Sequence, residues 1–406
     1  MSKAFKMTRD LFNSKLVKPR LPLSKASLAL IALLLSGCFG SSSAPNEPTP
    51  MPTPPSPPPP PPPQPSDSIQ FNHLGLSDLA VETLFATPDG VWVAGDQGIF
   101  FSDNPAATNP QQANWQHQLS DFYTLHLTGF HADEVYAIGV EAIDKPYALV
   151  RSTDRGQTWQ RIEHNFGGGD ANAYSNLEVL YADLDTGYLY AAGQQAIAVS
   201  YDQGQQWQLL SGEWGMIALS STLNRHPMYN DLWLGGQNAI EESTLVRFSL
   251  NQQTFEFWNA LLPAPSVNQH VVFDNGNPDR LLISAEGGIL TSDNYGETWD
   301  VLLEDTQNFY LSLLQSPKHT DLWYTGRWQK GLEPHPLEFM YSTDGGHHWQ
   351  THTHPNDDQN YGVRSMQLIP IDSSQGDVIW AGLQSGAWNA GGVMRIEIQL
   401  VDLHTP

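Results

Sequence analysis

The sequence predicts an all-β fold, a β-propeller of four-stranded antiparallel blades, from three observations. A short motif recurs at intervals of 41 to 51 residues, which is the spacing of one propeller blade. The chain has 33 Gly and 13 Trp but only 15% charged residues, a composition that favours strands and tight turns. Short apolar segments of strand length follow one another through residues 67–400. These segments form seven units, so we expect seven blades. A chain of this length can form one such domain because repeat folds grow by adding units.

The recurring motif has the form S-x-[DN]-x-G-x-x-W. Asp or Asn bonds back to backbone N–H groups and holds a turn, Gly supplies a positive φ, and Trp packs beneath the hairpin. Decayed copies end at Trp115 and Trp258. We therefore expect structural roles for the residues of the four clear copies, which are Asp154, Gly156, Trp159, Asp202, Gly204, Trp207, Asn294, Gly296, Trp299, Asp344, Gly346 and Trp349.

Each of the seven units contains two apolar β segments. The inner strands are predicted near Thr83–Ala86, Tyr123–Thr128, Leu177–Ala182, Met216–Ser220, His270–Asp274, Phe309–Leu314 and Arg364–Ile369. The second strands are predicted at Val91–Gly95, Val135–Gly139, Leu189–Gly193, Leu232–Gly236, Leu281–Ala285, Leu322–Gly326 and Val378–Gly382. The seventh unit ends at Val393–Ile398 without a fourth strand, so Ser68–His73 is predicted to supply it and to close the ring.

The N-terminal segment has the pattern of an export signal. A basic region precedes the short apolar run Ser27–Leu35, which ends in the tetrapeptide Leu-Ser-Gly-Cys at Cys38. This tetrapeptide resembles the bacterial lipobox, which implies cleavage before Cys38 and attachment of diacylglyceryl and palmitate. Phe39 rather than Asp follows, and this implies the outer membrane over the inner membrane. Cys38 is the single cysteine, so no intramolecular disulfide can form.

These features divide the chain into four parts. Residues 1–37 form a lipoprotein signal peptide, residues 38–66 the lipidated Cys38 with a Pro-rich tether, residues 67–400 the propeller, and residues 401–406 a tail. The proline run Pro57–Pro63 favours extended polyproline at ~3.1 Å per residue, so the tether can reach roughly 65 Å. We expect it to space the propeller from the membrane.

The charge balance excludes one class of partner. The chain has 19 Lys and Arg against 43 Asp and Glu, a formal net charge of −24. Removal of the basic signal peptide makes the mature chain more acidic still. An acidic surface repels phosphate backbones, so we expect no nucleic acid partner.

The motif copies resemble the BNR/Asp-box superfamily, over nearly all of residues 68–398. That superfamily includes sialidases, xyloglucan-cleaving glycosidases, sortilin-type receptors and photosystem II assembly factors, so the resemblance implies the architecture and leaves the activity open. The chain lacks the Phe/Tyr-Arg-Ile-Pro signature of sialidases, and it lacks the arginine-rich patch of the photosystem factors.

Propeller ligands usually bind at one mouth of the central channel, on the face away from the Asp-box turns. Loops predicted there carry aromatic and arginine side chains, which offer flat apolar area and forked donors. The predicted ligand-binding residues are Trp214, Arg327, Trp328, Tyr361, Arg364 and Trp388. The alternative is that these aromatics pack between blades.

Two classes of function remain open. The first is a monomeric, non-enzymatic binding or assembly module, held at the membrane by its lipid, for an envelope protein or glycan. The second is a carbohydrate-active hydrolase, for which Asp170, Asp357 and Asp358 lie on suitable loops. No catalytic residue is assigned and no cofactor is expected. The histidines His347, His348, His352 and His354 have no standard metal-site spacing, so we expect no metal site.

Overall fold

The structure is a computed structural model, and it describes most of the chain from Asp67 onward. The described residues are 67–142, 145, 147–163, 177–193, 196–211, 219–238, 242–259, 268–330, 335–355, 361–371, 376–384 and 390–400. The predicted signal peptide, Cys38, the tether and the tail lie outside them. Within the described part, no helix is long and apolar enough to cross a membrane.

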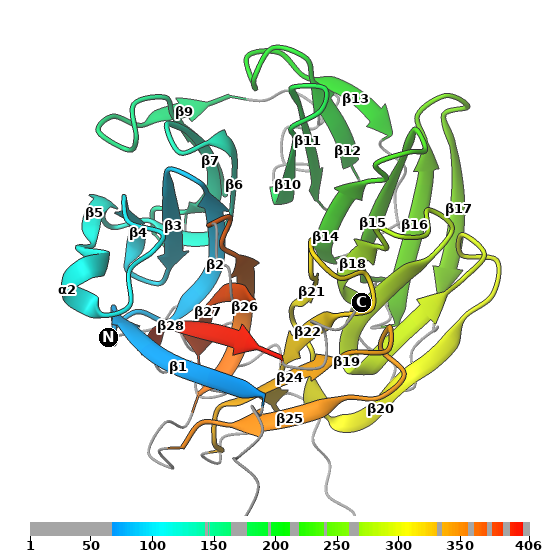
Figure 1. The fold of residues 1–406 in the computed structure, drawn as a ribbon. Coiled ribbons are helices and arrows are strands. Elements are labelled where there is room, and N and C mark those ends of the chain that lie inside the picture. Colours follow the sequence, from blue (N-terminus) through cyan, green and yellow to red (C-terminus); the bar gives the residue numbers. More distant parts are fainter. Residues whose placement is uncertain are drawn as a thin grey trace, which may run out of the picture. The chain divides into compact units, whose positions relative to one another are not determined.

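The described residues form seven four-stranded antiparallel sheets arranged as a seven-bladed β-propeller (Figure 1). This confirms the predicted fold class and the blade count. The first four blades, each listed from its inner to its outer strand, are β2 (Val81–Thr87), β3 (Gly90–Gly95), β4 (Gly98–Ser102) and β5 (Gln116–Leu119); β6 (Tyr123–His131), β7 (Glu134–Val140), β8 (Ala148–Ser152) and β9 (Gln160–Ile162); β10 (Leu177–Asp183), β11 (Tyr188–Gly193), β12 (Ala196–Ser200) and β13 (Gln208–Ser211); and β14 (Leu219–Arg225), β15 (Asp231–Gln237), β16 (Ser243–Ser249) and β17 (Thr254–Asn259).

The remaining three blades follow the same plan with local changes. They are β18 (Asn268–Phe273), β19 (Leu281–Ser292), β20 (Asp300–Phe309) and β23 (Trp328–Gln329); β21 (Leu313–Gln315), β22 (Trp323–Gly326), β24 (Glu338–Ser342) and β25 (Gln350–Thr353); and β26 (Gly362–Leu368), β27 (Asp377–Gln384), β28 (Ala390–Gln399) and β1 (Ser68–Gly75). A single-turn helix, α2 (Pro110–Ala113), interrupts the decayed motif of blade 1.

The N-terminal strand closes the ring as predicted. β1 pairs antiparallel with β28 from Ser68 opposite Gln399 to Gly75 opposite Val393, with one irregularity after His73. The outer strand of the last blade thus comes from the start of the propeller, and this pairing covers an edge that β28 would otherwise expose. Figure 1 shows β1 and β28 side by side.

Two inner strands differ from their predicted bounds. Phe309 belongs to the outer strand of blade 5, where it pairs with Trp328, so the inner strand of blade 6 is only Leu313–Gln315. In blade 4 the inner strand runs from Leu219 to Arg225, further along the chain than predicted. Both shifts reflect turns whose ends the apolar pattern does not mark.

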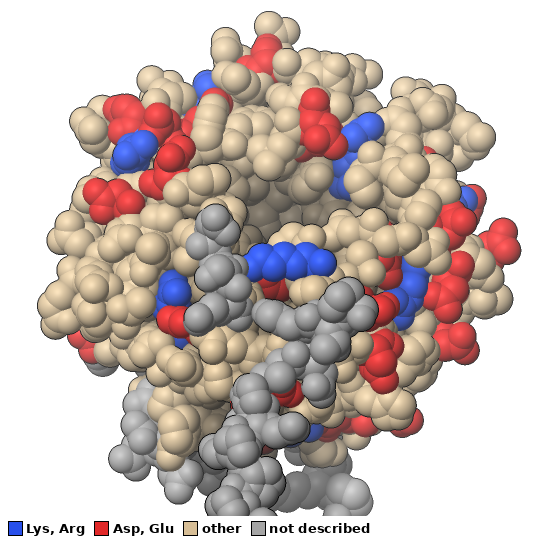
Figure 2. Space-filling view, in the orientation of Figure 1, with Lys and Arg blue, Asp and Glu red and all other residues tan. Residues whose placement is uncertain are grey.

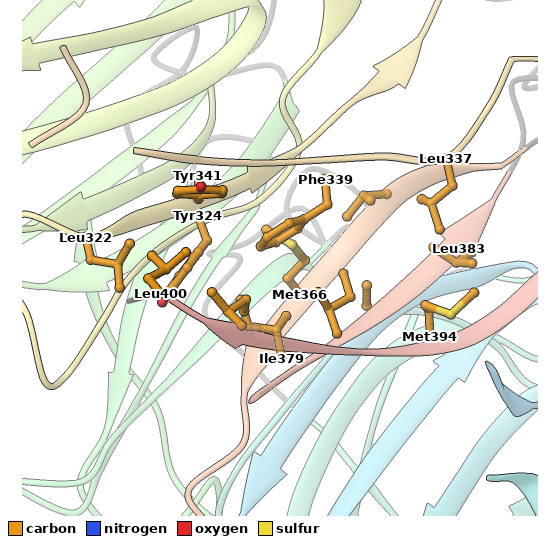
Figure 3. Close-up of a cluster of buried hydrophobic side chains, with 14 residues drawn as sticks. Leu322, Tyr324, Leu337, Phe339, Tyr341, Met366, Ile379, Leu383, Met394 and Leu400 are labelled. Atoms are coloured by element: carbon orange, nitrogen blue, oxygen red, sulfur yellow. The ribbon is translucent and has the colours of Figure 1, made fainter. Parts of the chain in front are cut away.

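The core is divided among the seven seams between blades. Successive residues of a strand face opposite sides of its sheet, and in a propeller both sides are covered by neighbours. Trp92 therefore packs into the seam with blade 2 while Val93 packs into the seam with blade 7. The seam between blades 6 and 7 shows the pattern in Figure 3, where Tyr324 and Phe339 face Ile379 and Met394.

Candidate functional site

The inner strands carry a repeated irregularity near the channel mouth. In six blades a β-bulge lies within the first residues of the inner strand. A bulge leaves one residue unpaired and re-aims its side chain. The bulged residues include Glu82, Glu178 and Arg364. Without the bulges, the alternating pattern of the strands would place apolar residues at the mouth of the channel. The bulges place charged side chains there instead.

Glu82 and Arg364 form the central ion pair of this site. Arg364 Nε donates to Glu82 Oε2 at 2.8 Å, and Glu82 is 3% exposed while Arg364 is 29% exposed. Glu82 Oε1 accepts from Tyr123 Oη at 2.9 Å and from Gln384 Nε2 at 3.0 Å. Three donors from blades 2 and 7 therefore hold one carboxylate of blade 1, and the network joins the two seams beside the ring closure.

The pKa values of the groups around Glu82 are shifted by burial and by these contacts. Burial alone would lower the pKa of Arg364, but the charge of Glu82 and its hydrogen bond outweigh burial and raise it. Burial raises the pKa of Tyr123 well above its ordinary value, and the neighbouring Glu82 raises it further. Burial likewise raises the pKa of Asp96, whose Oδ1 accepts from Ala80 N–H at 2.9 Å. Arg364 therefore stays charged and Tyr123 stays a hydrogen-bond donor across the physiological range.

Arg327 lies between blades 5 and 6 and is also held by carboxylates. Its Nη1 donates to Glu338 Oε2 at 2.8 Å, and its Nε lies 3.6 Å from Asp305 Oδ2. Tyr310 Oη donates to the same Asp305 Oδ2 at 2.8 Å. The pKa of Arg327 is raised: burial opposes the shift, and the hydrogen bonds that Arg327 donates to Glu338 and Tyr310 outweigh it. Neither mouth arginine is therefore a bare cation.

Trp328 joins blades 5 and 7 and is half-buried. Its strand pairs with the end of β20, and its ring meets Phe309 edge to face at 5.2 Å. Its Nε1 donates to Gln384 O at 3.1 Å, and Gly362 lies so close that a Cβ there would meet the ring at 2.4 Å. Trp328 thus has the inter-blade packing that was the alternative to ligand contact, while part of its surface stays open.

The structure brings four of the six predicted ligand-binding residues together. Val363 N–H donates to Arg327 O at 2.9 Å, which places Arg327 and Trp328 against the strand that begins beside Tyr361 and contains Arg364. Trp214 and Trp388 lie outside the described residues, as do Asp170, Asp357 and Asp358. The role of all six in ligand binding stays a prediction.

Sequence reasoning missed Glu82, Tyr123 and Gln384. A signal for Glu82 was present, because it is a charged residue inside the apolar segment VETLFAT of an inner strand. Buried acids are rare unless they are paired, so such a residue implies a partner. The partner itself lies 282 residues away, and nothing local identifies it.

The Asp-box turns hold the other face of the ring. In the second blade Gly156 N–H donates to Ser152 Oγ at 2.8 Å, and Thr158 N–H donates to Asp154 Oδ1 at 2.9 Å. The boxes of blades 3, 5 and 6 have the same glycine bond at 2.7–2.8 Å. Hydrogen bonds from Thr158 lower the pKa of Asp154, as expected for a carboxylate that accepts from a turn.

Each box also contacts the preceding blade, a role that the motif itself does not reveal. A Cβ on Gly156 would meet the Trp92 ring of blade 1 at 2.8 Å, and one on Gly296 would meet the Trp233 ring of blade 4 at 2.8 Å. Trp159 Nε1 donates to Gln118 O of blade 1 at 3.2 Å. The boxes therefore lock neighbouring blades together as well as turning their own hairpins.

The clustered histidines of blade 6 have separate partners. His348 Nδ1 lies 2.5 Å from Asp344 Oδ2 within the box, whereas the His352 ring stacks on Tyr341 and the His354 ring meets Phe71 edge to face. Among the described residues, no three His, Cys, Asp or Glu side chains are placed to hold a metal ion.

Two further histidines lie on inner strands of the ring. His126 lies on the inner strand of blade 2 and His270 on that of blade 5, and burial lowers the pKa of each to about 4. A charge on His270 would lower the pKa of His126 further, although their blades are not neighbours. Both imidazoles are therefore neutral at physiological pH.

Neither protein-family models nor curated proteins give a match to this chain. Solved structures do. The chain is similar to YCF48 bound to D1 peptide, at 18% identity and a TM-score of 0.57, over 82% of this chain and 97% of that one. It is also similar to the GH74 xyloglucanase from Xanthomonas campestris, at 15% identity and a TM-score of 0.54, over 77% of this chain.

The GH74 enzyme from Niastella koreensis is a third similar structure, at 13% identity and a TM-score of 0.56. This chain covers 53% of each of the two GH74 chains, so it spans about half their length. At these identities the likeness shows the fold.

Proposed function

We propose that this chain is a lipid-anchored envelope protein whose propeller is a non-enzymatic binding module with its ligand at the channel mouth. The anchor rests on Leu-Ser-Gly-Cys at Cys38 after a short apolar run. The outer membrane is the proposed location, because Phe39 follows the lipidated cysteine. We propose that the ligand is a protein segment or a glycan, and that the module acts as a monomer.

One observation carries the choice of binding over hydrolysis. A glycosidase needs two carboxyl groups facing the sugar, one of them protonated and one ionised. Three described carboxylates of the mouth are instead engaged: Glu82 by three donors, and Asp305 and Glu338 by Arg327. Groups already neutralised in this way orient aromatic and polar neighbours and have no free proton-transfer role.

The similar structures also support a binding module. The YCF48 structure has a bound D1 peptide, and this chain covers 97% of that YCF48 chain. A hydrolase remains the second candidate because the GH74 propellers share the fold.

The test must distinguish a loss of ligand binding at the mouth from a loss of stability of the propeller. Arg364→Ala alone would leave Glu82 buried without its partner, which typically destabilises by about 3–5 kcal/mol. We therefore choose the double variant Glu82→Gln/Arg364→Gln, which removes both charges together. Asp202→Asn, in a box on the opposite face, is the matched control, since Asn294 occupies the same motif position in blade 5.

The intact lipoprotein and both variants are used to capture ligands from their own membranes and from a glycan array, and each is assayed for release of reducing sugar from xyloglucan. We expect the double variant to lose capture, the control to retain it, and none to release sugar. Capture by the double variant would place the ligand elsewhere. Sugar release by the wild type would support the hydrolase.

A further inference from the structure

The large apolar side chains that the described residues expose are confined to one sector of the ring. All of them lie in blades 3 to 5, green to yellow in Figure 1, and none lies in the described parts of the other four blades. Leu184 and Met228 are each about 70% exposed, and Tyr201 is 56% exposed. An exposed apolar patch that is confined to one sector marks an interaction surface, whereas scattered single residues do not.

Leu184, Tyr201, Met228 and Tyr229 share one face as well as one sector. Leu184 and Met228 lie in the turns that follow the inner strands β10 and β14, and Tyr201 lies in the box that follows β12. In antiparallel blades both kinds of turn occur at the same end of the sheet, which is the Asp-box face. An ion pair between Arg225 and Asp183, at 3.3 Å, joins the two turns. The patch is thus opposite the proposed ligand mouth.

The patch is preorganised by ring stacking. The Tyr201 ring meets Tyr188 edge to face at 4.7 Å, and the Tyr229 ring meets Tyr295 at 4.6 Å. Tyr229 Oη also donates to Asp279 Oδ1 at 2.6 Å. Rigid tyrosines present contact area with little loss of rotamer freedom, which is why they are enriched at protein interfaces.

The charge of the sector that contains the patch restricts what can cover it. From Leu177 to Phe309 the sequence has 17 Asp and Glu but three Arg and no Lys. Each of these arginines is already paired, Arg225 with Asp183, Arg247 with Glu256, and Arg280 with Asp274. The face drawn in Figure 2 likewise shows many Asp and Glu and few Lys and Arg. Such a surface repels anionic lipid and a second copy of itself.

We propose that this patch, Leu184, Tyr201, Met228 and Tyr229 with their acidic rim, docks a second protein whose contact surface has apolar side chains surrounded by Lys and Arg. The apolar centre supplies affinity, and the opposite charges supply orientation and a fast encounter. The partner binds the Asp-box face while the channel mouth stays open. The chain would then connect a ligand at its mouth to a basic protein on its other face.

The experiment uses the full chain in its own membranes. A benzoylphenylalanine photo-crosslinker replaces Tyr201 in one variant and Thr343 in another. Both residues are exposed and occupy the same motif position, directly after the box serine, in blades 3 and 6. The crosslinked peptide is then sequenced at low and high salt, in the parent chain and in the Leu184→Ser/Met228→Ser double variant.

We expect a protein adduct at position 201 and none at 343. The adduct should join a segment rich in Lys and Arg, weaken at high salt, and fall about tenfold in the double variant because two interface anchors are lost. It should persist in Glu82→Gln/Arg364→Gln, which separates this surface from the proposed mouth. Equal adducts at both positions, an adduct unaffected by the double variant, an adduct to lipid alone, or one to a second copy of the chain would each overturn the proposal.

Discussion

Two glycines with the same backbone conformation offer a direct test of how Asp boxes act between blades. Gly156 has φ 80° in the box of blade 2, and Gly187 has φ 72° in the turn that follows β10. A Cβ on Gly156 would lie 2.8 Å from both the Trp92 ring and the Gln118 Cβ of blade 1. A Cβ on Gly187 would have nothing within 4 Å. The two sites therefore differ in one respect, the approach of the neighbouring blade.

Replacement by alanine gives both sites the same backbone penalty, about 1–2 kcal/mol for a left-handed residue with a side chain. Both also share the opposing gain of roughly 0.4–1 kcal/mol from a less flexible unfolded chain. Gly156→Ala adds overpacking against Trp92 and Gln118, which typically destabilises by about 1–3 kcal/mol. Gly156→Ala should thus lower the free energy of unfolding by about 1–3 kcal/mol more than Gly187→Ala.

Urea unfolding followed by tryptophan fluorescence measures this difference from the midpoints, provided that the slopes agree. In a Trp92→Phe background, which removes the ring atoms nearest Gly156, the extra penalty should shrink. If the two alanine variants lose the same stability in the wild-type background, the contact between box and neighbouring blade is energetically irrelevant, and the box acts within its own hairpin alone.

Three other predictions follow from the described contacts and from the sequence. Burial lowers the pKa of His126 and His270 to about 4, so both imidazoles bind protons at a higher pH in the unfolded chain than in the folded chain. The free energy of unfolding should therefore fall by about 1.4 kcal/mol per pH unit and per imidazole as the pH is lowered from 6.5 to 4. Urea titrations across that range should show a shallower slope for His126→Leu, and an unchanged slope would refute the assignment. Deletion of residues 68–75 exposes the β28 edge, so sedimentation should show aggregation, and a stable monomer would contradict the role of β1 as the closing strand. Cys38→Ala should move the chain from the membrane to the soluble fraction and abolish fatty-acid labelling, whereas labelling that persists would place the lipid elsewhere.

The sequence alone was sufficient for the architecture. Each blade contains its own turn motif and its own apolar strands, so the repeat is visible within windows of about 40–50 residues. The missing fourth strand of the last unit and the unpaired segment Ser68–His73 together predicted the ring closure. These signals are local or periodic, and periodicity survives small errors such as those at Phe309 and Leu219.

The site depended on the tertiary structure. Glu82 and Arg364 are 282 residues apart, and only closure of the ring places blade 1 against blade 7 so that their bulged residues meet. Trp328 was predicted to be an aromatic residue at the channel mouth. Its partial burial between Phe309 and Gly362 depends on a two-residue strand that no sequence pattern predicts. The motif also does not predict the contact of each box with the preceding blade. The residues of a repeat determine its own hairpin, whereas the contact with a neighbouring blade depends on how the blades pack. Local hydrogen bonds and turn preferences depend on adjacent residues, so they can be predicted from the sequence. The partner of a buried charge depends on which distant strands lie side by side once the ring has closed.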